Sequence, residues 1–105
     1  MRSIWKFPLA IVDFQEIEMP QGAKPLLVAV QPSVANRGLG TLCIWAEVDT
    51  DVPKIKRGVW IVGTGHPMLL VADAAKHIGS TLMVGQTFLD GPGFVWHVYM
   101  NEEPK

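Results

Sequence analysis

The chain has 105 residues, of which 49% are hydrophobic, and its formal net charge is −1. This length predicts one domain, residues 1–105, with a modest hydrophobic core. No block of basic residues is present, so the chain is not expected to bind polymeric nucleic acid. The single cysteine, Cys43, excludes an intrachain disulfide.

No apolar stretch approaches the ~20 residues that cross a membrane. Arg2 and Lys6 flank no sustained apolar run, so the N-terminal residues show no signal peptide pattern. We therefore expect a protein of the cytoplasm that is not associated with a membrane.

Alternating apolar and polar residues predict strands in the first half of the chain. Pro8 cannot donate a hydrogen bond, which places the first strand at an edge or at a bulge. Met19–Gly22 has the composition of a turn. Pro32–Gly40 is a loop that joins the third and fourth strands into a long hairpin, and the nearly all-apolar third strand is expected to be covered on both faces. The predicted strands are Ile4–Val12, Phe14–Met19, Lys24–Gln31 and Thr41–Asp49.

The second half begins with a polar connection, Thr50–Gly58, followed by a strand from Val59 that leads to a glycine-rich bend. Met68–Ala75 fits either one helical turn or a short strand, and this choice stays open. In the next strand, Ile78, Leu82 and Val84 are expected to share a face. The remaining segments are the strand His77–Val84, the loop Gly85–Gly93 and the strand Phe94–Asn101.

Together these segments make about seven short strands, and no amphipathic helix of useful length is evident. Turn signals separate them at the spacing typical of all-β domains. The sequence therefore predicts an all-β fold, a single small antiparallel β-sandwich or barrel.

The bend after the Val59 strand is the most site-like place in the sequence, because Gly63, Thr64, Gly65 and His66 follow one another there. Glycine adopts positive φ and lets other atoms approach the main chain, so we expect a sharp turn with exposed N–H groups. Such amides can form a concavity that holds an anion. With a hydroxyl and an imidazole beside them, these residues predict a site for a phosphate group.

Charged and aromatic residues elsewhere complete the predicted site. Arg57, from the basic cluster Lys54–Arg57, would add charge together with His66. Trp5 or Trp45 would stack on a base. The alternative interpretations are that the cluster is a set of solvated loop charges, and that Trp45 covers a contact between subunits or packs against a neighbouring loop.

Catalytic and metal-binding motifs are not evident. His66, His77 and His97 have no ligand spacing, so no metal or cofactor is expected, although strand pairing could still bring them together. For His97, within a predicted strand, donation to a neighbouring carbonyl is the simplest role. No nucleophile motif surrounds Ser80 or Thr64, so we predict that the protein is not an enzyme and assign no catalytic residue.

Several segments, taken together and in this order, resemble a family of small proteins of unknown function that bacteriophages and prophages encode. The segments are Ile4–Phe7, Ile17–Ala23, Trp45–Ala46 with Val48–Asp49, Gly63–His66 and Val95–Val98, and they span nearly the whole chain. Gly63–His66 is the most specific of them. Pro32–Gly40 and Met68–Ala75 are longer than the family pattern. The resemblance brings no activity with it.

What the resemblance implies is a context of counter-defence, in which small phage proteins without catalytic motifs bind a host component and hold it. The expected function is a homo-oligomeric binding protein that sequesters a small, phosphorylated, cyclic-nucleotide-type immune signal in the host cytoplasm. The alternatives are an inhibitor that binds a host defence protein directly, a small hydrolase and a virion accessory protein.

Overall fold

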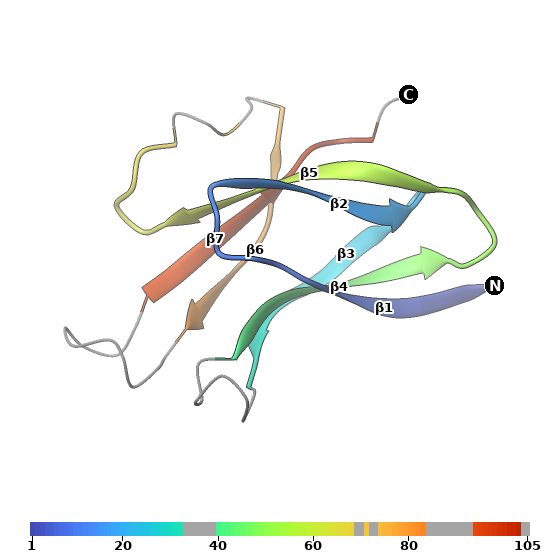
Figure 1. Cartoon of the computed structure of the whole chain (residues 1–105), viewed down its shortest axis with the longest axis horizontal. Helices are drawn as coiled ribbons and strands as arrows, with labels where there is room; N and C mark the ends of the chain where they lie inside the picture. Colours follow the sequence, from blue (N-terminus) through green and yellow to red (C-terminus); the bar gives the residue numbers. More distant parts are fainter. Residues whose placement is uncertain (33–39, 69–70, 72–73, 84–93, 104–105) are drawn as a thin grey trace.

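The computed structural model describes residues 1–32, 40–68, 71, 74–83 and 94–103. In these residues all regular structure is β-strand, as predicted, and the strands form two antiparallel sheets packed as a sandwich (Figure 1). Sheet A has the order β1-β4-β3, and sheet B has the order β2-β5-β7-β6. The strands are β1 (Arg2–Pro8), β2 (Phe14–Pro20), β3 (Lys24–Gln31), β4 (Thr41–Asp49), β5 (Lys54–Gly63), β6 (Lys76–Met83) and β7 (Phe94–Met100).

The core lies between the two sheets and follows from alternation within each strand. On β4, every second residue from Leu42 to Val48 is buried against sheet B. Sheet B contributes alternate residues of β5 and β7 to the same cluster. The side chains that meet across this interface include Leu42, Ile44, Ala46, Val48, Val59, Ile61, Val98 and Met100. Each sheet therefore has an inner face, toward the core, and an outer face.

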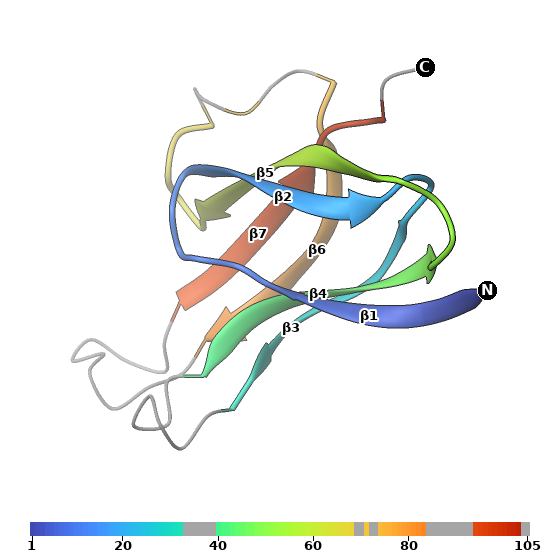
Figure 2. The same cartoon turned by 45° about the vertical axis from the view of Figure 1, so that its right-hand side comes forward.

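At one side of the sandwich, β3 of sheet A lies beside β6 of sheet B (Figure 2). Gly79 makes this approach possible, because a Cβ atom built there would lie 2.8 Å from both Cβ and Cγ2 of Val28. The pairing of β6 with β7 shifts register between His77 and Gly79, which marks a bulge at the same place.

The bulge corrects the prediction that Ile78 and Leu82 share a face; Val84, the third residue of that prediction, lies outside the described residues. Ile78 packs against the core, whereas Leu82 is 49% exposed on the outer face. The two residues therefore lie on opposite faces, because the extra residue at the bulge inverts the alternation that the sequence pattern assumed.

Two predicted strand boundaries are also wrong. The first strand ends at Pro8, and the chain then turns as the Gln15 side chain donates to Ala10 O at 2.8 Å. The predicted connection Thr50–Gly58 is shorter than expected, since β5 already begins at Lys54. The sequence pattern missed the start of this strand because its outer positions carry the exposed Lys54 and Lys56, and because the inward-facing Arg57 is charged.

The third strand has the predicted bounds, but it is not buried on both faces as predicted. Leu26 and Leu27 are each 52% exposed. A register shift between Pro25 and Leu27 disturbs the pairing with β4 at this point, and Val28 is the one buried residue among the apolar residues of the strand. The turn predicted at Met19–Gly22 is confirmed, with Gly22 at φ 81°.

Three predicted segments fall wholly or partly outside the described residues. They are the loop Pro32–Gly40, the segment Met68–Ala75 and the loop Gly85–Gly93. The hairpin that the first of these loops was expected to close is confirmed by the pairing of β3 with β4.

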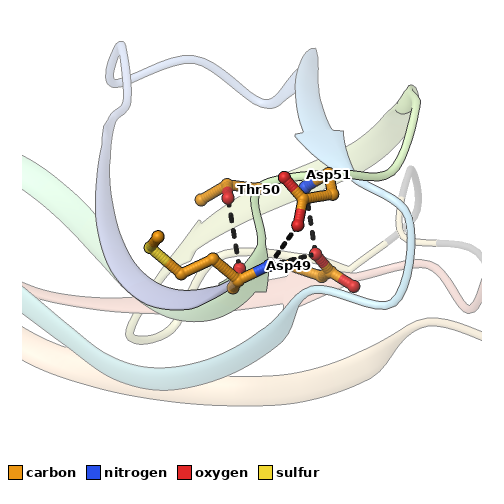
Figure 3. A network of polar contacts seen from close by, with 4 residues as sticks. Asp49, Thr50 and Asp51 are labelled. Atoms are coloured by element: carbon orange, nitrogen blue, oxygen red, sulfur yellow. Dashed lines mark hydrogen bonds and ion pairs between the residues drawn. The ribbon is translucent and has the colours of Figure 1, made fainter.

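A polar network ties the start of β1 to the connection between β4 and β5 (Figure 3). The ammonium group of Met1 pairs with the carboxylates of Asp49 and Asp51. Thr50 donates to Met1 O through its hydroxyl and its amide. The hydrogen bonds that the Met1 ammonium group donates to the carboxylates of Asp51 and Asp49 raise its pKa. Hydrogen bonds that the Asp51 amide and the N-terminus donate to the Asp49 carboxylate lower the pKa of Asp49.

We predict that Gly79→Ala destabilises the fold by about 1–3 kcal/mol, because the added methyl group overpacks the contact with Val28. The free energy of unfolding in urea measures this. The double variant with Val28→Gly should be less destabilised than the sum of the two single variants, since glycine lacks both of the carbon atoms that the added methyl group meets. If the changes in the free energy of unfolding are simply additive, the side chains at the two positions do not clash.

The polar network predicts a pH dependence of thermal stability. The Asp49 carboxylate stabilises the fold above its ordinary pKa, and this contribution is lost as the pH falls through its lowered value. The Met1 ammonium stabilises the fold below its ordinary pKa of 8.0, and this contribution is lost as the pH rises through its raised value. Thermal unfolding measured from about pH 2 to about pH 11, a range that extends beyond both ordinary values, should show both losses.

Asp51→Asn is the control for the alkaline loss, because it removes the first partner of the ammonium group. The variant should lose less stability than the parent protein as the pH rises. Identical slopes for the two proteins would contradict this assignment.

Candidate functional site

The predicted bend begins where β5 ends and turns as expected. Gly65 has φ 85°, a conformation that glycine adopts without strain. The residues from Thr64 to Pro67 are exposed. The bend is therefore open to solvent, and its positive φ explains the second glycine of the motif.

Most amides of the bend are already used within the fold. Thr64 N–H donates to Val95 O at 3.2 Å, and His66 N–H donates to Gly63 O at 3.0 Å. The N–H of Gly65 donates no hydrogen bond within the described residues. The bend can therefore offer one main-chain donor to a ligand rather than the row of amides that the glycines suggested.

Thr64 and His66 lie on opposite sides of the bend. Alternation along β5 puts Thr64 on the outer face of sheet B, where its hydroxyl contacts His97 Nε2 at 2.8 Å. The His66 ring folds back over Gly63, and a Cβ atom built on that glycine would lie 2.8 Å from His66 Nδ1. Gly63 thus makes room for an imidazole and for the nearby Trp96 ring.

The basic cluster is divided by the same alternation. Lys56 is exposed on the outer face of sheet B, whereas Arg57 points inward and is only 5% exposed. Lys54 Nζ lies 5.7 Å from the centre of the Trp5 ring. Arg57 is also six residues from Gly63 along a strand, about 20 Å away. The structure does not bring Arg57 to the bend.

Neither of the two predicted stacking residues lies near Thr64. Trp5 pairs with Ala46 and packs against the core, so it belongs to the inner face of sheet A. Trp45 pairs with Lys6 and lies on the outer face of that sheet. The sandwich therefore separates both rings from the outer face of sheet B, and of the predicted side chains only Thr64 is found there.

Thr64 instead belongs to a hydrogen-bonded series, which we call the polar chain: Thr64, His97, Ser80 and His77. His97 Nε2 lies 2.8 Å from Thr64 Oγ1, and its Nδ1 lies 2.6 Å from Ser80 Oγ. Ser80 Oγ is also 2.7 Å from His77 Nε2. Because Ser80 has one hydroxyl hydrogen, it donates to one imidazole and accepts from the other.

A row of rings runs across the same face, next to the polar chain. Phe14 pairs with Trp60, Trp60 with Tyr99, and Tyr99 with His77, so four strands each contribute one ring. The ring centres of Phe14 and Trp60 are 4.9 Å apart, and those of His77 and Tyr99 are 5.3 Å apart. We call these four residues the aromatic row.

The sequence analysis missed His97, Ser80 and His77 as members of one site. His97 contacts two hydroxyl groups rather than a neighbouring carbonyl. The sequence did allow for strand pairing that brings histidines together. The structure confirms this for His77 and His97, whose ring centres are 6.3 Å apart. His66 lies apart, against Gly63.

Other chemistry is limited in the part of the chain that the structure describes. No three His, Cys, Asp or Glu side chains gather there in a way that could hold a metal ion. Within the same residues no helix is long and apolar enough to cross a membrane. Cys43 is buried, and its burial raises the pKa of the thiol, as expected of an unreactive buried cysteine.

The geometry defines a two-sheet β protein whose outer face on sheet B carries the polar chain and the aromatic row. The chain belongs to the family described as Domain of unknown function (DUF7352), whose family model matches residues 1–105. No curated protein matches the chain, and no solved structure matches it.

We predict that Gly65→Val destabilises the protein by about 1–3 kcal/mol, because a β-branched residue is strained at positive φ. No atom lies within 4 Å of a Cβ built there, so the cost comes from the backbone alone. Urea unfolding measures it. Gly65→Asn is the matched control and should cost less, since asparagine tolerates this conformation better. Equal losses for the two variants would contradict the backbone explanation.

Proposed function

We propose that the protein binds a small phosphorylated ligand with an aromatic base on the outer face of sheet B and holds it without chemical change. The main support is the register that sets Trp60, Tyr99 and His77 side by side, next to the polar chain. Aromatic rings on the surface of a sheet can stack on bases, at about 1–3 kcal/mol per base. The hydroxyl and imidazole groups beside them can bond a base edge or a phosphate oxygen.

The charge and the open amide of this face also suit an anion. Gly65 offers its N–H at one end of the polar chain. Lys56 is exposed on the same face, four residues before Trp60 on β5 and so about 13 Å from it. A ligand that carries a phosphate and a base at separate points would use both ends of this surface.

In this proposal the ligand is a cyclic-nucleotide-type immune signal, and the protein is a phage-encoded factor that lowers the free concentration of that signal in the host cytoplasm. A homo-oligomeric form fits the exposed apolar residues of sheet A. Ile4 is 61% exposed and Leu27 is 52% exposed, and both lie near Trp45 in register. Larger exposed apolar patches commonly mark a protein interface.

A hydrolytic function is a second candidate, and one observation favours it. A nucleophilic hydroxyl needs a base within hydrogen-bond reach. Ser80 Oγ meets this requirement twice, at 2.6 Å from His97 and 2.7 Å from His77. In this alternative the bound molecule would be cleaved instead of stored.

We predict that a cyclic dinucleotide, a cyclic trinucleotide or a cyclic ADP-ribose isomer raises the midpoint of thermal unfolding. A ligand at about 100 times its dissociation constant stabilises the folded state by about 2.7 kcal/mol. Trp60→Leu should then weaken binding of that nucleotide by about 5- to 150-fold, the equivalent of one stacked base. Calorimetric titration measures the change.

Trp45→Leu is the matched control, because it removes a half-buried tryptophan from the opposite outer face. It should leave the affinity unchanged. If no nucleotide shifts the midpoint, or if both variants weaken binding equally, the proposal fails and direct inhibition of a host protein becomes the better explanation. Mass spectrometry of the ligand released after denaturation separates storage from hydrolysis, since only hydrolysis alters its mass.

A further inference from the structure

Arg57 occupies an unusual position for a charged residue. It lies on the inner face of β5 and is only 5% exposed. Its neighbour across the sheet is the half-buried Ile17. Burial of an ionised group is unfavourable unless partners compensate for the lost hydration, so the surroundings of this guanidinium indicate what the site is built to hold.

The guanidinium is only partly satisfied within the fold. Arg57 Nη2 donates to Asn101 O at 2.8 Å. Nη1 lies 3.7 Å from Glu103 Oε1, which is an ion pair but too long for a hydrogen bond. Among the described residues neither Nε nor Nη1 has a hydrogen-bond partner. Buried donors without acceptors are rare in native proteins and call for an explanation.

A cavity of about 320 Å³ adjoins this guanidinium. Pro25, Ile78 and Met100 provide an apolar wall, and Lys76 lies at the exposed rim, where it pairs with Glu102 at 2.8 Å. The volume is at the lower end of the range for small-molecule sites. The cavity thus combines an apolar wall with a buried cation.

Glu103 covers the cation from the segment that follows β7. Its Oε1 also accepts a hydrogen bond from Gly22 N–H at 2.5 Å. This side chain is 27% exposed and belongs to no strand, so it can move away without breaking a sheet. The negatively charged partner that Arg57 already has is therefore a carboxylate outside the strands.

We propose that this cavity binds a small organic carboxylate. The carboxylate of the ligand accepts from Arg57 Nη1 in place of Glu103, and the apolar part of the ligand lies against Ile78 and Met100. The site is separate from the outer face of sheet B, because Arg57 points to the opposite side of β5. It therefore does not depend on the proposed nucleotide binding.

The test uses benzoate as the probe and benzamide as its neutral counterpart, with the full chain. The ¹H–¹⁵N signal of Arg57 Nε–H, identified by its loss in Arg57→Met, reports contact with the guanidinium. Benzoate should shift this signal in a saturable way, and benzamide should not. Equal shifts with both compounds, or no shift with benzoate, would overturn the proposal.

Glu103→Gln provides a second test that does not need a variant at the buried arginine. Removing the competing charge should strengthen benzoate binding by about tenfold. Glu102→Gln is the matched control, because Glu102 pairs with Lys76 on the rim, and it should change the affinity by less than about twofold. If Glu103→Gln leaves benzoate binding unchanged or weakens it, Glu103 is a structural partner and the proposed exchange is wrong.

Discussion

Burial of the apolar interface between β4 and the β5–β7 pair is the interaction on which the rest of the structure depends. Leu42, Ile44, Val59 and Val98 are each at most 1% exposed there. Burying one such side chain contributes about 1.5–3 kcal/mol relative to leaving it exposed. Because this burial decides which residues of each strand face inward, it also decides which residues are left to form an outer face. Both candidate sites are consequences of that division.

The predicted site combined residues that are close in sequence, and the division into faces separated them. Arg57 and Thr64 are seven positions apart on one continuous strand and bend, so alternation places them on opposite sides of sheet B. Trp5 and Trp45 belong to the other sheet. Thr64 alone of the predicted side chains belongs to the site on the outer face of sheet B, since its hydroxyl contacts His97 on the neighbouring strand. Proximity in sequence is therefore a poor guide to a shared site in a β-sandwich.

Local pattern did predict much of the fold. The bounds of β3 and β4 and the turn at Gly22 follow from alternation and turn composition. The polar chain could not be predicted in this way, because His77 and Ser80 are three residues apart and would lie on opposite faces of a regular strand. The bulge after His77 brings both to one face. A bulge of this kind depends on the partner strand and on the close contact of Gly79 with β3, neither of which is local.

The polar chain can run in two directions without losing a hydrogen bond. In one, Thr64 donates to His97, His97 to Ser80, and Ser80 to His77. In the other, every donor and acceptor is exchanged, and His77 becomes the first donor. Only the second arrangement leaves the Thr64 hydroxyl hydrogen free for a ligand. A phosphate oxygen beside Thr64 therefore favours the second direction. That direction also decides which nitrogen of the His97 ring and of the His77 ring donates, and His77 is one end of the aromatic row.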